Sequence, residues 1–153
     1  MNIFILDEDP KKAAQYLCDK HVVKMLLESA QMLCTVHWTQ GNEAPYKKCH
    51  VNHPCTIWAR ESIDNYNWLL THGKEICKEY TKRYSKIHKS QAVIEWAEKN
   101  VPRLPKLGLT PFRLAMPDHC KTNNVVESYR KYYHLAKRDF AKWKCEKPDW
   151  WIA

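Results

Sequence analysis

The chain has 153 residues, and 44% of them are hydrophobic. This predicts one globular domain, residues 1–153, and argues against intrinsic disorder. The formal net charge of +8 indicates an anionic partner. Eight tyrosines and seven tryptophans accompany this charge. Because bases stack on aromatic rings while lysine and arginine bind phosphates, nucleic acid fits the composition better than a membrane.

The seven cysteines are an odd number, which is typical of free thiols in a reducing compartment. The segment from Met1 to Leu6 is too short for the apolar core of a signal peptide, and three acidic residues follow it directly. No apolar run reaches the length of a membrane-spanning helix. We therefore expect a cytoplasmic protein with no membrane partner and no obligate protein partner.

The first half of the chain predicts an apolar arm followed by helices. Residues 2–6 are expected to form a short strand or an extended arm packed against the rest of the protein. Asp9 and Pro10 predict the start of a helix, with Asp9 as N-cap. Helical periodicity then continues to about Trp38, with a bend near Asp19, and residues 39–53 predict a loop.

The second half predicts three more helical segments and one long loop. A helix opens at His53-Pro54, breaks at residues 71–73 and resumes to about Tyr84. A shorter helix spans residues 90–100, and the proline-rich residues 101–122 form a loop. The last helix runs from Asn124, with Glu127 as its capping-box partner, to about Trp143. The predicted fold is all-α: a compact single-domain helical bundle with a short extended N-terminal arm and a long Pro-rich loop before the C-terminal helix.

The segment from Cys18 to Glu28 carries the first candidate site. On a helix, His21, Lys24 and Glu28 share one stripe, next to an apolar stripe that includes Met25 and can face a core. A carboxylate beside a cation at such an edge is a candidate acid or base. The alternative is a plain surface pair of Lys24 and Glu28 at i, i+4, and the spacing by itself favours it.

Cysteine and histidine together offer a possible zinc site. The loop cluster at residues 49–55 contains Cys49, His50, His53 and Cys55. The sequence lacks the paired Cys-x-x-Cys motifs that would make zinc binding a strong prediction. We therefore expect no metal and no other cofactor, and a zinc-dependent enzyme remains the third alternative.

The C-terminal helix mixes aromatic and basic residues. The aromatic residues recur at helical spacing and are expected to be mostly core, with cations on the other faces. Those cations are either a solvated surface or a phosphate-contacting surface that positions a duplex. Lys47, Lys48 and His50, in the loop predicted at residues 39–53, would extend that surface.

The order of these parts resembles the pyrimidine-dimer DNA glycosylase/AP lyase family of the endonuclease V type, which is found in phages. Members carry a helix with Asp-x-His, as in Asp19 to His21 here, followed by a catalytic glutamate at the position of Glu28. Many relatives contain Asn-His-Pro, as at residues 52–54, and end in an aromatic and basic run similar to residues 129–133. The chain is expected to be a divergent, phage-encoded relative.

This resemblance implies a mechanism that needs no metal. The nucleophile would be the N-terminal α-amine, which ordinarily has a pKa of about 8, so that a useful fraction is neutral. It would attack the sugar of a damaged nucleotide in duplex DNA and form an imine that permits β-elimination. Glu28 would be the general acid and base, and His21 and Lys24 would lie near the DNA backbone.

Two positions differ from the well-known members of the family. Those members expose a small residue after removal of the initiator methionine, whereas residue 2 here is Asn, which is too bulky for efficient removal. The amine would then be that of Met1, or that of Asn2 if the chain is processed. Those members also carry an arginine immediately before the glutamate, whereas Leu27 stands here and the nearest cation is Lys24.

We therefore expect an N-glycosylase/AP lyase that acts on damaged or modified bases in duplex DNA. The alternative is a non-catalytic phage protein that binds nucleic acid or a host enzyme. The predicted catalytic residues are Met1, Asn2, Glu28, His21 and Lys24. The predicted DNA-binding residues are Lys20, Lys47, Lys48, His50, His53, Arg60, Arg130, Lys131 and Lys137.

Overall fold

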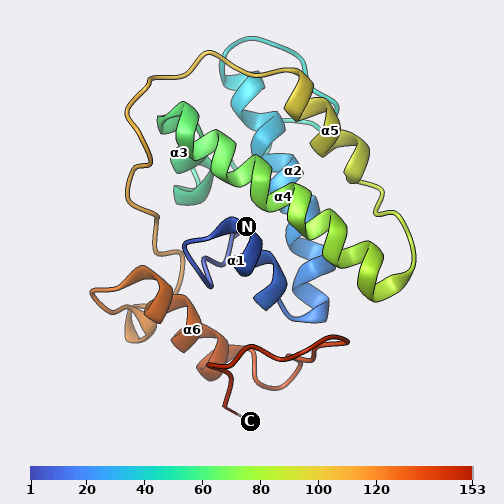
Figure 1. Ribbon diagram of the computed structural model, residues 1–153. Coiled ribbons are helices and arrows are strands. Elements are labelled where there is room, and N and C mark those ends of the chain that lie inside the picture. The colour runs from blue at the N-terminus through green and yellow to red at the C-terminus, as the bar shows by residue number, and fades with distance from the viewer. Residues whose placement is uncertain (153) are drawn as a thin grey trace.

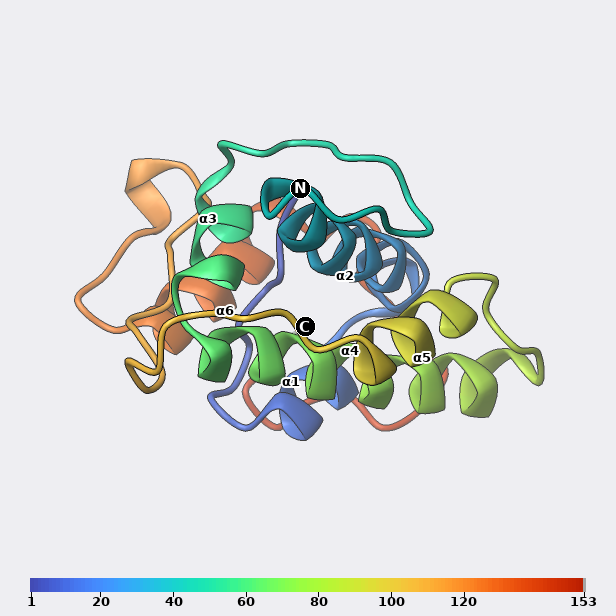
Figure 2. The same cartoon turned by 90° about the horizontal axis from the view of Figure 1, so that it is seen from above.

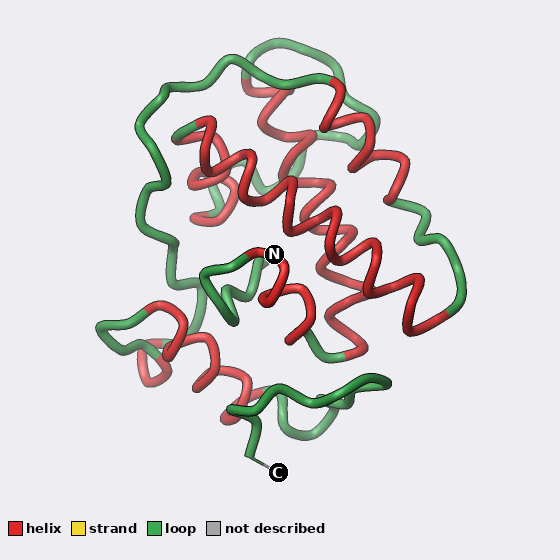
Figure 3. The backbone as a smooth tube through the Cα atoms, in the orientation of Figure 1, coloured by secondary structure: helices red, strands yellow, loops and turns green. Residues whose placement is uncertain are grey.

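The computed structural model describes residues 1–152, and every regular element in that range is helical (Figure 3). The all-α prediction is confirmed. The elements are α1 (Pro10–Tyr16), α2 (Asp19–Thr39), α3 (Pro54–Glu61), α4 (Ile63–Tyr84), α5 (Gln91–Lys99), the short 3-10 helix η1 (Asp118–Cys120) and α6 (Val125–Ala136).

The two longest helices, α2 and α4, pack against each other and form the centre of the molecule (Figure 1). The helix α1 packs on α4, while α3 and α5 each contact both central helices. Seen from above, α6 lies beside the N-terminal arm on the side away from α5 (Figure 2). The side chains of Tyr129 and Tyr133 on α6 are fully buried and contact the ring of Phe4 in the arm. The arm therefore joins α6 to the rest of the core.

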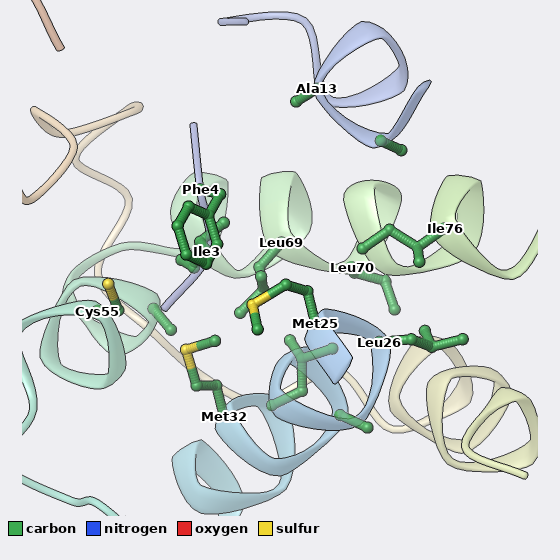
Figure 4. Packing of buried hydrophobic residues seen from close by; sticks show 14 of the residues in the cluster. Ile3, Phe4, Ala13, Met25, Leu26, Met32, Cys55, Leu69, Leu70 and Ile76 are labelled. Carbon is green, nitrogen blue, oxygen red and sulfur yellow. The ribbon is translucent and has the colours of Figure 1, made fainter. Parts of the chain in front are cut away.

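The N-terminal arm runs through the interior between the helices. Ile3, Phe4, Ile5 and Leu6 are all buried, as expected for an arm packed against the protein (Figure 4). The arm is not a strand, since it turns at Phe4, which has a φ of +59°, and Leu6 N donates to Phe4 O at 2.9 Å. Because its side chains occupy the core, the arm is held in a defined path.

The predicted bend near Asp19 is a complete break between two helices. The helix α1 ends at Tyr16, and Leu17 has extended backbone. The guanidinium of Arg83, from α4, donates to the carbonyls of Leu17 at 2.7 Å and Gln15 at 2.9 Å. This buried arginine satisfies the carbonyls that the helix end leaves open.

Two other boundaries predicted for the middle helices are wrong. The helix expected to open at Pro54 breaks at Ser62, whose hydroxyl accepts from Asp64 N at 3.1 Å and caps α4. The break predicted at residues 71–73 is absent, and α4 is continuous there. A Cβ on Gly73 would lie 2.8 Å from Ile94 Cδ1, so this glycine permits the close packing of α5 rather than a turn.

The last helix is shorter than predicted. It begins after Asn124, whose side chain caps Glu127 N at 2.9 Å, but it ends at Ala136 instead of near Trp143. Beyond it the chain packs back on the junction of α1 and α2. There Trp143 Nε1 donates to Tyr16 O at 2.9 Å, and Asp19 N donates to Lys142 O at 2.7 Å. These tertiary contacts replace helical hydrogen bonds.

The proline-rich segment after α5 passes along the outside of α3 and reaches α6 (Figure 1). The indole of Trp58 donates to Thr110 O at 3.1 Å, and the buried amide of Asn65 bonds to the hydroxyl and backbone of Thr110. Tyr129 then donates to Arg113 O at 2.7 Å. The same hydroxyl accepts from Ala115 N at 3.2 Å, which holds Ala115 beside the N-terminal arm.

Candidate active site

The N-terminus lies against the carboxylate of Glu28. The α-amino nitrogen of Met1 is 3.2 Å from Glu28 Oε1, and Asn2 N donates to the same oxygen at 2.9 Å. Glu28 comes from the buried face of α2 and is only 7% exposed. The charged amine and the backbone donor of Asn2 explain how this carboxylate is accommodated in the core.

The surface pair of Lys24 and Glu28 is not formed. Lys24 is exposed, whereas the buried carboxylate of Glu28 forms its ion pair with Met1. The stripe predicted from the sequence therefore divides. Its lysine faces solvent and its glutamate faces the arm, because the arm covers this part of α2.

Met1 is held by its side chain, which is 2% exposed. The residue as a whole is nevertheless only half-buried. Its remaining accessible surface is therefore on the main chain, where the amine lies. A ligand approaching from solvent meets the amine before it meets the nitrogen of Asn2.

The side chain of Asn2 is buried and hydrogen-bonded through both its oxygen and its nitrogen. Its Oδ1 accepts from Ile3 N at 2.7 Å and Phe4 N at 3.1 Å, and its Nδ2 donates to Ala115 O at 2.8 Å. The sequence suggested Asn2 only as an alternative amine and gave no signal for this role. The partner carbonyl lies far along the chain.

The start of α3 lies near the amine. Burial, followed by the charges of the N-terminus and His50, lowers the pKa of His53. His53 Nδ1 accepts from Cys55 N at 3.1 Å, so the neutral ring carries its proton on Nε2. Burial also raises the pKa of the Cys55 thiol to about 11, which keeps it protonated and unsuited to act as a nucleophile.

His21 is not on a solvent-facing stripe, contrary to expectation. It is 5% exposed, its ring stacks on Phe4 with centroids 4.3 Å apart, and its Nδ1 lies 2.6 Å from the hydroxyl of Tyr133. Burial, followed by the charges of Lys137 and Lys24, lowers its pKa to about 3. The contacts of this enclosed ring join the arm to α2 and α6.

Two of the predicted DNA-binding lysines, Lys20 and Lys137, and the predicted catalytic Lys24 lie beside this aromatic cluster. Lys20 and Lys137 lie over the ring of Phe140 at 5.0 Å and 5.9 Å, and Lys137 also lies over Tyr132 at 4.7 Å. Lys24 is close enough for its charge to act on His21. These residues, Lys20, Lys24 and Lys137, are called the lysine group below.

Two predicted DNA-binding arginines are instead occupied within the protein. Arg130 donates to Leu6 O at 3.0 Å, pairs with Asp7 at 3.4 Å, and lies over the ring of Trp150 at 5.2 Å. Arg60 donates to Val51 O at 2.7 Å and so holds the loop before α3. Both guanidinium groups are half-buried, because they satisfy backbone carbonyls at the ends of irregular segments.

The remaining predicted cations are exposed. Lys47, Lys48 and His50 lie on the loop between α2 and α3, which is tied to α2 by two 3.2 Å bonds between Thr35 and Cys49. Lys131 is exposed on α6. The structure thus brings together only part of the predicted basic surface.

Residues 49–55 do not form a metal centre in the structure. Within residues 1–152, no three histidine, cysteine, aspartate or glutamate side chains are grouped closely enough to hold a metal ion. The side chain of Cys55 is buried beside Ile3 instead (Figure 4). The zinc alternative therefore has no site in the described part of the chain.

A sequence model of the family described as pyrimidine dimer DNA glycosylase matches residues 1–92. The chain belongs to this family. The matched region includes the arm, α1 to α4, Glu28 and His53. No curated protein and no solved structure gives a significant match.

Membership in the pyrimidine dimer DNA glycosylase family confirms the predicted resemblance. It identifies the protein as an enzyme of a DNA glycosylase family, with DNA as its substrate. Among the residues that the structure describes, no helix has the length and apolar character needed to cross a membrane.

Proposed function

We propose that the protein is a pyrimidine-dimer DNA glycosylase with AP lyase activity, in which the α-amine of Met1 is the nucleophile and Glu28 the acid and base. The observation that carries this proposal is the 3.2 Å contact between Met1 N and Glu28 Oε1. This distance is within proton-transfer reach. Met1 is half-buried and its side chain is enclosed, so its exposed surface is on the main chain and the amine is open to a substrate.

In the first step the neutral amine attacks C1′ of the damaged nucleotide. The bond from C1′ to the base nitrogen breaks, and its electron pair leaves with the base, which takes up a proton. The amine nitrogen gives up a proton to the carboxylate of Glu28, and the bond from C1′ to the ring oxygen opens. Glu28 transfers a proton to that oxygen, and the product is an imine between Met1 and the opened sugar.

In the second step the imine acts as an electron sink. A base removes a proton from C2′, and the electron pair moves toward the imine to form an enamine. The enamine electrons then form a double bond between C2′ and C3′ as the bond from C3′ to its phosphate oxygen breaks, with the phosphate as leaving group. Water then hydrolyses the imine and returns the free amine. Since Oε1 of Glu28 already accepts from Asn2, we assign the second oxygen, Oε2, to the sugar.

The lysine group supports the approach of a duplex to this site. Lys24 lies one helical turn before Glu28 on α2, and Lys20 one turn before that. Phosphates bound there would hold the backbone beside the amine without reading sequence. The damaged nucleotide must leave the helix stack to reach Met1, as enzymes that act on bases require.

Reductive trapping tests this proposal. The protein is incubated with three matched duplexes, containing a pyrimidine dimer, an abasic site or no damage, in the presence of borohydride. We expect a covalent adduct with the damaged duplexes and none with the undamaged one. Binding to all three without any adduct would overturn the proposal in favour of a non-catalytic DNA-binding protein.

A further inference from the structure

The side chain of Asn2 does more than fill space in the core. It is 7% exposed, and its amide makes three hydrogen bonds to backbone groups. Two of them, to Ile3 N and Phe4 N, bend the arm onto its own side chain, as asparagine does in Asx turns. The third fixes the arm to Ala115 O, in a segment remote in the sequence.

The turn made by Asn2 includes the one residue of the arm with a positive φ. Phe4 has a φ of +59°, a conformation that is costly for an aromatic residue. The bond from Phe4 N to Asn2 Oδ1 and the stacking of Phe4 on His21 together hold it there. Two independent contacts of Phe4, one through its backbone nitrogen and one through its ring, therefore fix the path of the arm at this turn.

This path places the amine of Met1. Asn2 N donates to Glu28 Oε1 at 2.9 Å, so the residue after the amine is fixed through its main chain and its side chain. Only the torsion angles of Met1 itself remain free, and its side chain is 2% exposed. The amine is thus held at 3.2 Å from the carboxylate.

We infer that Asn2 is the positioning residue for the reacting amine, and that this amine belongs to a retained Met1. The inference rests on the proposed function. Removal of Met1 would empty the space of a buried side chain and move the amine to a position that is 7% exposed. The size of Asn2 hinders removal of Met1, and its side-chain amide makes the turn.

The test uses variants that keep Met1. Asn2→Leu keeps the branched shape of the side chain, with a larger volume, and removes all three side-chain bonds. Asn2→Asp keeps the Oδ1 acceptor, but it replaces the donor to Ala115 O with a carboxylate oxygen and adds a negative charge near Glu28. Serine, alanine and threonine are avoided because a small residue 2 invites removal of Met1. Intact mass checks that Met1 is present in each protein.

Asn65→Leu is the matched control. Asn65 is also a buried asparagine whose side chain makes three bonds, to Trp58 O, Thr110 Oγ1 and Thr110 N. It lies on α4 and holds Thr110, while Ala115 is held separately by Tyr129, so the loss of Asn65 lowers stability without removing a bond of Asn2. All proteins are compared at a temperature where each is folded.

We measure the single-turnover rate of adduct formation at saturating abasic-site DNA, and the DNA dissociation constant separately. For Asn2→Leu we expect the rate to fall about 10²-fold, the effect of misplacing a reacting group by about 1 Å, with little change in the dissociation constant. For Asn2→Asp we expect a smaller loss of rate. For Asn65→Leu we expect the wild-type rate.

The peptide that carries the trapped sugar identifies the amine. We expect it to begin with Met1. Adduct on Asn2, or a wild-type rate in Asn2→Leu, would overturn this inference and leave the proposed glycosylase and AP lyase activity standing. No adduct with the wild-type protein would overturn both.

A readout independent of activity is the hydrogen exchange of Ile3 N and Phe4 N, which both donate to Asn2 Oδ1. We expect these amides to lose protection in Asn2→Leu and to keep it in Asn65→Leu. Unchanged protection in Asn2→Leu would show that other contacts fix the arm, and would overturn the positioning role.

Discussion

The backbone nitrogen of Asn2 donates a hydrogen bond to Oε1 of Glu28 at 2.9 Å, and both residues are buried. Because this bond needs only an acceptor, an amide at position 28 can keep it. The structural and chemical roles of Glu28 can therefore be separated by one substitution.

We expect Glu28→Gln to preserve the fold and DNA binding while lowering the rate of adduct formation. Gln keeps an acceptor for Asn2 N but cannot transfer a proton, and loss of an acid or base costs about 10²- to 10⁴-fold. Single-turnover trapping on abasic-site DNA measures the rate. A rate within about threefold of wild type, with Met1 retained, would remove Glu28 from the chemistry.

We expect one extra residue before Met1 to abolish adduct formation. An added glycine converts the amine of Met1 into an amide, which is not nucleophilic, and moves the new amine away from Glu28. DNA affinity measured by fluorescence anisotropy serves as the control and should change little. Trapping at the normal rate on the added glycine would contradict a fixed position for the amine.

The stability of the protein should fall as the pH decreases below about 6.5. Burial lowers the pKa of His21 to about 3 and that of the fully buried His72 to about 4. The unfolded chain binds protons at these histidines below about pH 6.5, while the folded protein does not until its lower pKa values are reached. Stability is therefore fully present above that pH and is lost on acidification.

Each of these histidines should contribute about 1.4 kcal/mol of lost stability per pH unit between about pH 6 and 4. Urea unfolding at several pH values gives the slope. We expect His21→Gln to reduce the slope of stability against pH by the contribution of one histidine. His119 is exposed, so His119→Gln serves as the control for loss of a histidine. An unchanged slope in His21→Gln would show that the ring is not buried neutral.

Arg83→Met should destabilise the protein strongly. The Arg83 side chain is fully buried, bonds two carbonyls at the end of α1, and pairs with Glu79 at 3.0 Å and Asp19 at 3.3 Å. Breaking a buried pair leaves the partner charges uncompensated, which costs about 3–5 kcal/mol. Chemical denaturation measures this.

The matched control for that prediction is Arg113→Met. Arg113 forms its ion pair with Glu61 on the surface, where such a pair contributes about 0–1 kcal/mol. Equal losses of stability in the two variants would contradict a special role for the buried network around Arg83.

Neutralising Lys24 should affect DNA binding, whereas neutralising Arg130 should affect the stability of the protein. The exposed Lys24→Gln should weaken DNA binding and lower the slope of log affinity against log salt by about 1, with no loss of stability. Arg130→Gln should lower the melting temperature, since Arg130 bonds Leu6 O and Asp7, and should leave the salt slope unchanged. A reduced salt slope in Arg130→Gln alone would reverse these assignments.

The helical character of the chain was predictable because helix signals are local. Asp9 and Pro10 start α1, Asn124 caps α6, and the apolar stripe of α2 appears as the periodicity that includes Met25 and Leu26. The break at Leu17 and the end of α6 at Ala136 were not predictable. Both depend on contacts between distant parts of the chain, from Arg83 to Leu17 O in one case and from Trp143 to Tyr16 O in the other.

The candidate site shows the same division. The sequence by itself marked Glu28, at its spacing from Asp19, and the unusual residue at position 2. Local spacing nevertheless favoured a surface pair with Lys24, because a helical pattern contains no information about a segment that covers it. Only the tertiary structure brings Met1 to Glu28 and encloses His21 between Phe4 and Tyr133. Long-range burial of the arm decides which side of α2 is solvent and which is the site.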